Sequence, residues 1–279
     1  MVERARKQVK EKVARAYDLI HTPFDSNREE SMIALTNLLL RDLDIPENAI
    51  ALDIGCGTGC STFELFKRCN YKGSLYGIDI SRKSIDKAIQ NVAERGYSDI
   101  KFQVGDAEQL NFPDSTFNLV ISNMCFQFLP NKNGALSEIL RVLKPGGRVA
   151  FTYPGRPIYN EAREVLLEVA GRHHSNPEIA EAVKENDKLL IDLEESIDLF
   201  ESAGFTNLNL YGIYQIRHVH PSWFLKTSSG TWGLWKYGLS SRIVDRIHDD
   251  LLIELKLRAS DKGFKLTWYL IIAYGVKPE

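Results

Sequence analysis

Two arrangements of hydrophobic positions alternate along the chain and predict two kinds of element. Residues 1–44 carry apolar residues at spacings of three and four, which is typical of amphipathic helices. Between residues 45 and 154, short apolar runs alternate with helical stretches, and this order predicts right-handed crossovers and a mostly parallel sheet. The strands expected in this region cover residues 50–54, 74–80, 99–106, 118–124 and 147–154.

The pattern turns helical again after the fifth predicted strand. Residues 155–200 and 222–262 are helical or mixed, whereas residues 206–219 alternate like a strand and residues 266–276 form a last apolar strand. There is no repeat and no low-complexity linker, so the outer helical zones are interpreted as one cap over the sheet. The predicted organisation is a helical lid, a core, a cap with one inserted core strand, and a last strand, at 1–44, 45–154, 155–262 and 263–279.

A glycine-rich loop joins the first predicted strand to the next helix and reads Asp53-Ile54-Gly55-Cys56-Gly57-Thr58-Gly59. Glycines there allow a tight turn and a close backbone approach, and the helix N-terminus offers free N–H groups to a ligand. Asp79 ends the next strand and can accept both hydroxyls of a ribose, while Asp106 stands at the end of the third strand and can accept an adenine amine. The loop lacks both the dinucleotide spacing and the P-loop lysine, so a nucleoside without a pyrophosphate fits best.

In these segments the chain resembles the class I S-adenosylmethionine-dependent methyltransferases, through ALDIGCGTG, YGIDIS, VGDAEQLNFPDSTFNLVISN and EILRVLKPGGRVAF. The resemblance covers about residues 45–155 and the last strand. It implies a Rossmann-like α/β fold, whose seven-stranded, mostly parallel sheet has an antiparallel last strand, plus the helical cap. It also implies S-adenosyl-L-methionine as cofactor, S-adenosyl-L-homocysteine as product, and no metal.

The same resemblance implies a role for each cofactor residue. The glycine loop lies against the methionine part, Asp79 holds the ribose, and Asp106 holds the adenine. Ile80 and Ala107 line the adenine pocket, and Asn123 stands where the methyl group meets its acceptor. The full predicted set is Asp53, Gly55, Cys56, Gly57, Gly59, Asp79, Ile80, Asp106, Ala107 and Asn123.

A narrower resemblance concerns the acceptor. Ser122–Phe128, SNMCFQF, resembles the S-N-x-x-x-Q-W stretch of malonyl-acyl-carrier-protein methyltransferases, and Gly263–Lys277 resembles the end of that family. Gly155–Tyr159 resembles a segment of the juvenile-hormone-acid methyltransferases. Both families make methyl esters, which implies O-methylation of a small-molecule carboxylate. Phe128 replaces the tryptophan and residues 228–238 are unusual, so an N-, C- or phenolic O-methyltransferase of a small metabolite is the alternative.

Three residues are predicted to serve the acceptor. Tyr17 is expected to close over the active site, while Gln127 and Arg156 are expected to hold a carboxylate, the latter as a bidentate pair. Such an acceptor is already ionised and needs no base. Further candidates for an apolar wall are Trp223, Phe224, Trp232, Trp235 and Tyr237, and further candidate bases are His173, His174, His218 and His220.

Composition and charge narrow the class of protein. The 279 residues are 44% hydrophobic and 26% charged with a net charge of −2, which is typical of a globular chain and argues against a nucleic-acid partner. No apolar run reaches membrane-span length, and the charged N-terminus does not resemble a secretory signal, so a cytoplasmic location is predicted. The four cysteines fit no zinc spacing and are too sparse for a disulfide framework.

Charge also bears on partners and on competing functions. Lys and Arg outnumber Asp and Glu in residues 1–15 and 217–265, and a basic rim there would suit an acidic acyl-carrier protein that presents the acceptor. The alternative from another class is an inactive protein that binds S-adenosylmethionine or S-adenosylhomocysteine, although the intact glycines and acids argue against it. An RNA methyltransferase is disfavoured by the near-neutral charge, and the pattern makes no prediction of oligomeric state.

Overall fold

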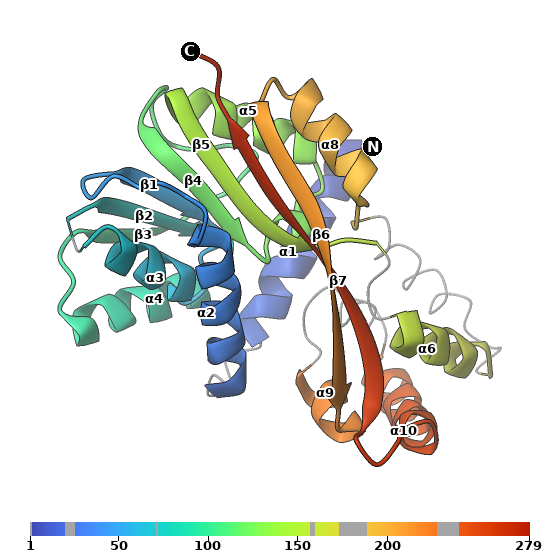
Figure 1. Ribbon diagram of the computed structural model, residues 1–279. Helices are drawn as coiled ribbons and strands as arrows, with labels where there is room; N and C mark the ends of the chain where they lie inside the picture. The colour runs from blue at the N-terminus through green and yellow to red at the C-terminus, as the bar shows by residue number, and fades with distance from the viewer. Residues whose placement is uncertain (1, 20–25, 71, 157–159, 173–188, 228–239) are drawn as a thin grey trace. The chain divides into compact units, whose positions relative to one another are not determined.

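A seven-stranded sheet forms the centre of the fold (Figure 1). The computed structural model describes residues 2–19, 26–70, 72–156, 160–172, 189–227 and 240–279. The strand order is β3-β2-β1-β4-β5-β7-β6, and β1 to β5 pair in parallel. The strands are β1 (Ile50–Ile54), β2 (Ser74–Asp79), β3 (Ile100–Val104), β4 (Phe117–Asn123), β5 (Leu143–Pro154), β6 (Thr206–Val219) and β7 (Phe264–Val276).

The predicted strands are confirmed with shifts of a few residues at their ends. The antiparallel direction of β7 is also confirmed, because Gly146 N donates to Lys277 O and Gly155 N donates to Tyr269 O, so numbers rise along β5 as they fall along β7. The chain order reverses between β1 and β4. In open α/β sheets this switch point is where the carboxyl ends of strands leave a crevice for a ligand.

Helices cover both faces of the sheet. In Figure 1, α3 and α4 lie on one face, and α5 and α8 lie on the other. The described helices are α1 (Val2–Leu19), α2 (Ser26–Leu40), α3 (Cys60–Arg68), α4 (Arg82–Arg95), the short 3-10 helix η1 (Phe126–Phe128), α5 (Lys132–Val142), α6 (Asn160–Arg172), α8 (Leu193–Ser202), α9 (Pro221–Thr227) and α10 (Ser241–Leu257). Within the stretch 155–200, which was predicted to be helical, residues 157–159 and 173–188 lie outside the described residues.

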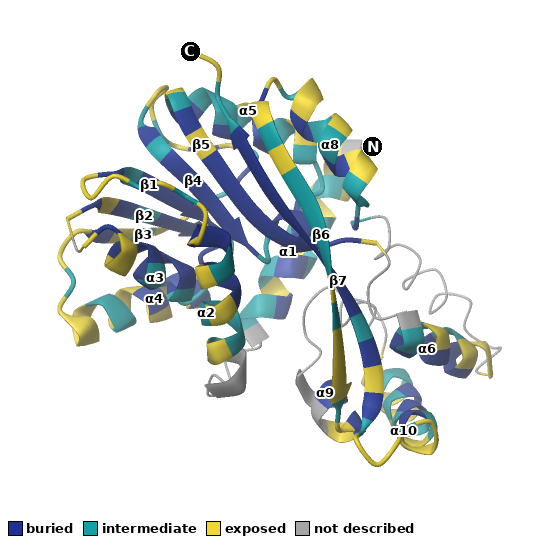
Figure 2. Ribbon diagram, in the orientation of Figure 1, coloured by how far each residue is buried: buried dark blue, intermediate teal, exposed yellow. Residues whose placement is uncertain are grey.

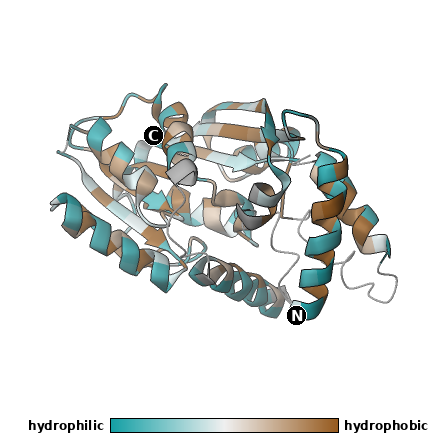
Figure 3. Ribbon diagram, turned by 90° about the horizontal axis from the view of Figure 1, so that it is seen from below, coloured by the Kyte–Doolittle hydropathy of each residue, from teal (hydrophilic) through white to brown (hydrophobic). Residues whose placement is uncertain are grey.

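Burial follows the hydrophobic pattern. Figure 2 shows that β4 is buried almost throughout and β5 is buried over residues 149–154, because helices cover the sheet there, whereas the edge strand β6 is largely intermediate or exposed. Figure 3 shows hydrophilic residues on the outer faces of the flanking helices. Since a parallel strand covered on both faces reads as a continuous apolar run, the runs in β1 and β4 were reliable strand signals.

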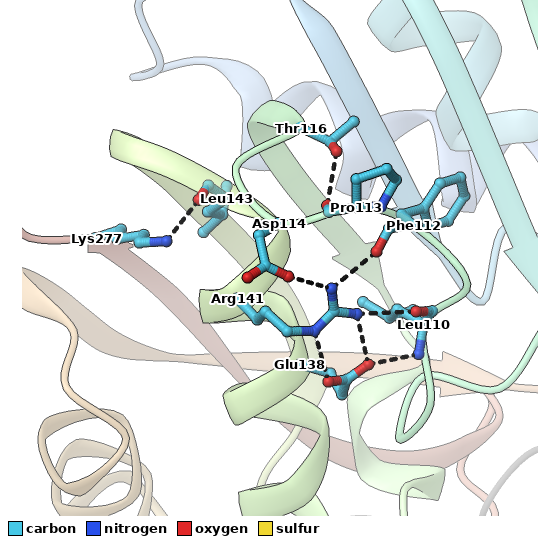
Figure 4. Close-up of polar contacts among 9 residues, drawn as sticks. All are labelled: Leu110, Phe112, Pro113, Asp114, Thr116, Glu138, Arg141, Leu143 and Lys277. Carbon is cyan, nitrogen blue, oxygen red and sulfur yellow. Dashed lines mark hydrogen bonds and ion pairs between the residues drawn. The ribbon is translucent and has the colours of Figure 1, made fainter.

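Hydrogen bonds from Arg141 hold the connection between β3 and β4, the segment that contains Asp106 (Figure 4). The Arg141 guanidinium donates to the carbonyls of Leu110 and Phe112, at 2.9 and 2.8 Å, and to the Asp114 carboxylate at 2.7 Å. Glu138 accepts from Arg141 and from Leu110 N, and its hydrogen bond to Arg141 keeps the pKa of Glu138 below its ordinary value. The connection is therefore held by bonds to its backbone.

The chain divides into two compact units, each with its own contacts. The first contains residues 1–153, 193–211 and 271–279, and the second contains residues 154–192 and 212–270. Helix α8 belongs to the first unit, whereas the sequence assigned it to the cap over 155–262. The physical reason is Phe200, which is fully buried and whose ring lies 5.7 Å from Phe151 and 5.8 Å from Phe126 between centroids.

The second unit has a hydrophobic core of its own, formed by α6, α9, α10 and the adjoining part of β7. Phe224 is 3% exposed and packs within this core, and it does not line the pocket described below, so a role in walling an acceptor stays a prediction. Glu161 accepts from the backbone N–H and the hydroxyl of Thr267, at 2.9 and 2.6 Å. The Glu161 carboxylate therefore provides an acceptor for the Thr267 N–H, which lies on β7 beyond the part of that strand that pairs with β5.

Candidate functional site

A pocket of about 1230 Å³, including its open mouth, lies in the first unit where β1, β2, β3 and β4 end. The pocket is open to solvent, so a ligand can enter it from the surface. The predicted cofactor residues that line it are Gly55, Cys56, Gly57, Asp79, Ile80, Asp106, Ala107 and Asn123. Residues from four strand ends, which span 68 positions from Gly55 to Asn123, therefore meet around one space.

The glycine loop has the conformation that its sequence predicts. Gly55, Gly57 and Gly59 all have positive φ, at 71°, 53° and 94°. A Cβ on Gly55 would lie 2.2 Å from Cys125 Sγ, and one on Gly59 would lie 2.8 Å from the Phe63 ring. The loop thus needs glycine for backbone conformation and, at Gly55 and Gly59, for space. Gly59 is the N-cap of α3 and does not line the pocket.

The Asp79 carboxylate is fixed by the backbone on both sides. Its Oδ2 accepts from Gly57 N and its Oδ1 accepts from Ser81 N, each at 2.9 Å. Burial raises the pKa of Asp79, although the hydrogen bonds from Ser81 and Gly57 counteract this effect. Each oxygen keeps a further lone pair, so the carboxylate can accept two more hydrogen bonds from a ligand.

The Asp106 carboxylate stands at the end of β3 and has a different environment. Its Oδ1 accepts from Glu108 N at 2.9 Å, and its Oδ2 accepts from the ammonium of Lys10 at 2.7 Å. Lys10 belongs to α1, 96 residues away in sequence. The predicted adenine acid is therefore part of an ion pair that the sequence did not reveal.

Asp53 lies behind the glycine loop and does not line the pocket. Its side chain is buried, with Oδ2 accepting from the Thr62 hydroxyl at 2.6 Å, while Oδ1 has no partner among the described residues. Burial raises the pKa of Asp53 to about 7, and the Thr62 hydrogen bond only partly offsets it. Burial therefore favours the protonated form of this acid of the glycine motif.

Asn123 lines the pocket, but its amide also holds two helices in place. Its Nδ2 donates to the hydroxyls of Thr36 and Ser61, at 2.9 and 3.1 Å, and its Oδ1 accepts from the Thr152 hydroxyl. These bonds join β4 to α2, α3 and β5. The amide therefore fixes the pocket wall, and direct contact with a reacting group stays a prediction.

Three thiols border the pocket: Cys56, Cys60 and Cys125. Burial raises the pKa of each, to about 12 for Cys60, and neighbouring carboxylates act in the same direction. A thiol with so high a pKa is protonated at neutral pH and is a poor nucleophile or base. Within the described chain, no group of three or more His, Cys, Asp or Glu side chains has the arrangement of a metal site.

An apolar wall forms part of the pocket lining. Its members are Val13 and Tyr17 from α1, Met32 from α2, and Phe128, Leu129 and Pro130 after β4. The Tyr17 and Phe128 rings meet edge to face with centroids 5.6 Å apart. Tyr17 was predicted here, whereas the other members were not, although the spacing of Lys10, Val13 and Tyr17 along one helix face was a usable signal.

Gln127 and Arg156 are not brought together in one unit. Gln127 is buried behind the pocket, where its Nε2 donates to Met124 O at 2.8 Å, and it does not line the pocket. Arg156 lies in the second unit and pairs with Asp192 at 3.3 Å. A role in holding an acceptor stays a prediction for both residues. The geometry does not support that role for Gln127, because its side chain does not line the pocket.

The remaining candidates lie elsewhere in the chain. His218 and His220 are exposed in the second unit, and His220 Nδ1 lies 2.7 Å from the Ser222 hydroxyl. Trp232, Trp235, Tyr237, His173 and His174 lie outside the described residues, as does the side chain of Trp223. Over the ranges that the structure describes, no helix is long and apolar enough to cross a membrane.

The sequence of this chain is similar to those of known methyltransferases. A family model described as a methyltransferase domain matches residues 45–209. Aklanonic acid methyltransferase DauC of Streptomyces sp. (strain C5) is 34% identical over 145 residues, which make up 52% of this chain and 66% of that protein. A demethylmenaquinone methyltransferase of Lactiplantibacillus plantarum is 30% identical over 180 residues, or 61% of this chain and 76% of that protein.

Solved structures share the fold at lower sequence identity. The YcgJ protein of Bacillus subtilis aligns with a TM-score of 0.61 and 18% identity, covering 88% of this chain and 99% of that one. Phosphoethanolamine N-methyltransferase 2 of Haemonchus contortus, in complex with S-adenosyl-L-methionine, aligns with a TM-score of 0.55 and 20% identity, covering 90% of this chain and 53% of that one. At these identities the likeness concerns the fold alone.

Proposed function

The chain belongs to the methyltransferase-domain family and is a class I S-adenosylmethionine-dependent methyltransferase, and we propose that it methylates a carboxylate oxygen of a small, largely apolar acid. The proposal rests on one observation above all. The described pocket joins a site suited to a nucleoside to an apolar wall, and its described lining contains no histidine.

The chain's own residues fit the cofactor. The Asp79 carboxylate, held by Gly57 N and Ser81 N, has free lone pairs for the two ribose hydroxyls. Asp106 and Ala107 would hold the adenine, and Gly55 leaves no room for a side chain where the backbone meets Cys125. When bound, S-adenosylmethionine supplies a methyl group that its sulfonium already activates.

The apolar wall limits the acceptor. Val13, Met32 and Leu129 offer hydrocarbon surface, and the Tyr17 and Phe128 rings can pack against a planar group. These side chains exclude water and hold the acceptor close to the donor, and such positioning supplies about 7–11 kcal/mol of a displacement barrier. We infer an acceptor with a sizeable apolar body.

The ionisable groups that line the pocket limit which kind of acceptor atom can be methylated. No histidine is among the described lining residues, and the three thiols have raised pKa values. Of the two carboxylates in the lining, Asp106 is paired with Lys10, and Asp79 accepts from Gly57 N and Ser81 N and is assigned to the ribose. An amine, a phenol or a carbon acid needs a base, whereas a carboxylate is ionised at pH 7 without one. The relative named for aklanonic acid, an acid, supports the same choice.

A second candidate is methylation of a ring carbon of a quinone-like molecule. The observation in its favour is the coverage of the demethylmenaquinone methyltransferases: that of Anoxybacillus flavithermus is 26% identical over 211 residues, 73% of this chain and 88% of that protein. The apolar wall suits this acceptor equally well. Presentation of the acceptor on an acyl-carrier protein also stays a prediction, motivated by the basic segments of the sequence.

Product chemistry and the pH profile test the proposal together. The enzyme is incubated with saturating S-adenosylmethionine and a panel of apolar acids, phenols, amines and quinols, and methylated products are found by mass spectrometry. A methyl ester is cleaved by dilute hydroxide, whereas methyl ethers, N-methyl and C-methyl products survive. For a carboxylate the maximal rate should be nearly flat from about pH 6 to 9. A rate that climbs about tenfold per pH unit, with a base-resistant product, would exclude the carboxylate acceptor.

A further inference from the structure

One face of α1 forms part of the pocket wall. Lys10, Val13 and Tyr17 line the pocket at spacings of three and four residues. Val13 and Ala16 are the hydrophobic residues that this helix buries within its described length, and most of its other side chains are polar and exposed or half-buried. Because so little apolar surface is buried, the attachment of α1 depends strongly on its polar contacts.

These polar contacts tie α1 to two segments that follow strands of the cofactor site. Lys10 Nζ lies 2.7 Å from Asp106 Oδ2 and 2.7 Å from Glu108 Oε2, in the connection after β3. Near the other end of the helix, Asp18 Oδ1 accepts from the Ser81 hydroxyl at 2.6 Å, just after β2. The helix therefore spans the pocket from one strand end to the other.

The Lys10 contact is stronger than an ordinary surface ion pair. The exposed fractions of the Lys10 and Glu108 side chains are 21% and 9%, so water screens the pair incompletely. Burial disfavours the charge on Lys10, but hydrogen bonds to Asp106 and Glu108 outweigh it and hold the pKa of Lys10 above its ordinary value. Glu108 also accepts from Asn131 N at 2.9 Å, so its carboxylate is itself held in place.

We propose that α1 is a strap over the cofactor pocket, latched by Lys10, and that release of Lys10 from Asp106 and Glu108 sets the rates of cofactor entry and departure. The inference rests on the proposed function, in which Asp106 faces the cofactor. The Asp106 oxygens each accept one bond within the protein and keep a further lone pair, so a ligand N–H and Lys10 can share the carboxylate. The ion pair is therefore present in the free protein and in the complex alike. Its loss should change the rates of association and dissociation more than it changes the affinity.

Ligand kinetics on Lys10→Met test the proposal, since methionine keeps most of the stem and removes the ammonium. Binding of S-adenosylhomocysteine to the immobilised full chain is followed by surface plasmon resonance. Association and dissociation rates should both rise about tenfold, which corresponds to about 1.4 kcal/mol of latch energy, while Kd changes less than about twofold. Lys7→Met, an exposed position on the same helix, is the matched control and should leave both rates unchanged.

A second variant reaches the latch from outside the pocket. Glu108 does not line the pocket, and Glu108→Gln keeps an acceptor for Asn131 N while removing the charge that faces Lys10. Both rates should rise here too, and the double variant should add less than the sum of the two, because both changes remove one interaction.

Each other pattern of rates overturns the latch. A faster dissociation alone would make Lys10 an ordinary ligand contact, a faster association alone would make it a competitor of the ligand, and unchanged rates would leave it no role. Failure of the wild-type chain to bind S-adenosylmethionine would instead count against the proposed function. Hydrogen exchange without any cofactor separates the two, since Lys10→Met should speed exchange in residues 10–18 in either case, and unchanged exchange there would overturn the latch.

Discussion

Replacement of Asp79 by alanine removes a carboxylate that accepts hydrogen bonds from both the glycine loop and the N-cap of α4. Asp79 accepts from Gly57 N and Ser81 N at 2.9 Å and retains two lone pairs for a ligand. Hydrogen bonds to a charged acceptor contribute about 1.5–3 kcal/mol each, so loss of two ribose contacts costs at least about 3 kcal/mol. Water that enters the space recovers part of this, and S-adenosylhomocysteine should therefore bind at least about tenfold more weakly.

Isothermal titration measures the effect, and two comparisons make it specific. Asp86→Ala removes an exposed carboxylate from α4 and should leave affinity unchanged. A 2′-deoxy analogue of the ligand should bind the wild type more weakly than the parent compound does, yet bind Asp79→Ala almost as well as the parent does, since the partner of the hydroxyl is gone. An affinity within about twofold of wild type in a folded Asp79→Ala protein would refute the assignment of Asp79 to the ribose.

Further predictions concern stability. Gly55→Ala should lower the free energy of unfolding, measured by urea titration, by about 2–4 kcal/mol, because its Cβ would lie 2.2 Å from Cys125 Sγ at φ 71°. Gly57→Ala is the control: its φ is 53° and its Cβ would have no atom within 4 Å, so the free energy of unfolding should fall by only about 1 kcal/mol. Equal losses for the two variants would contradict the steric argument. The folded-state pKa of Asp53 is raised from 3.8 to about 7, so the folded chain holds a proton that the unfolded chain has released, and stability falls as pH rises through this window. Relative to Asp53→Asn, the wild type should lose up to about 1.4 kcal/mol per pH unit there and nothing further above about pH 8, and parallel pH curves would show that Asp53 is ionised throughout.

The elements of the sheet were predictable from the sequence because they depend on local pattern. β1 and β4 are buried on both faces and read as continuous apolar runs, while the glycines of the 55–59 loop report a backbone conformation that other residues rarely adopt. The positions of Asp79 and Asp106 at strand ends followed from the same pattern. Since parallel strands end at one edge, their meeting in one pocket could be expected as well.

Contacts across long sequence separations were not predictable in this way. Lys10 meets Asp106 and Glu108 only because α1 packs beside the end of β3, and nothing in the local sequence of either segment records its partner. The same holds for Asn123, whose amide is taken up by Thr36, Ser61 and Thr152. A single sequence shows which hydrogen-bonding groups a side chain has, but not which of the possible partners in the folded chain bind them.

The sequence by itself determined the order and type of the core elements, the glycine loop and the two strand-end acids, because short-range sterics and hydrophobic periodicity specify them. Only the tertiary structure decided that α8 packs in the first unit through Phe200, that Phe224 is core, and that Gln127 lies behind the pocket. These outcomes depend on which apolar faces bury against each other, and that choice is made by the packing of the whole chain.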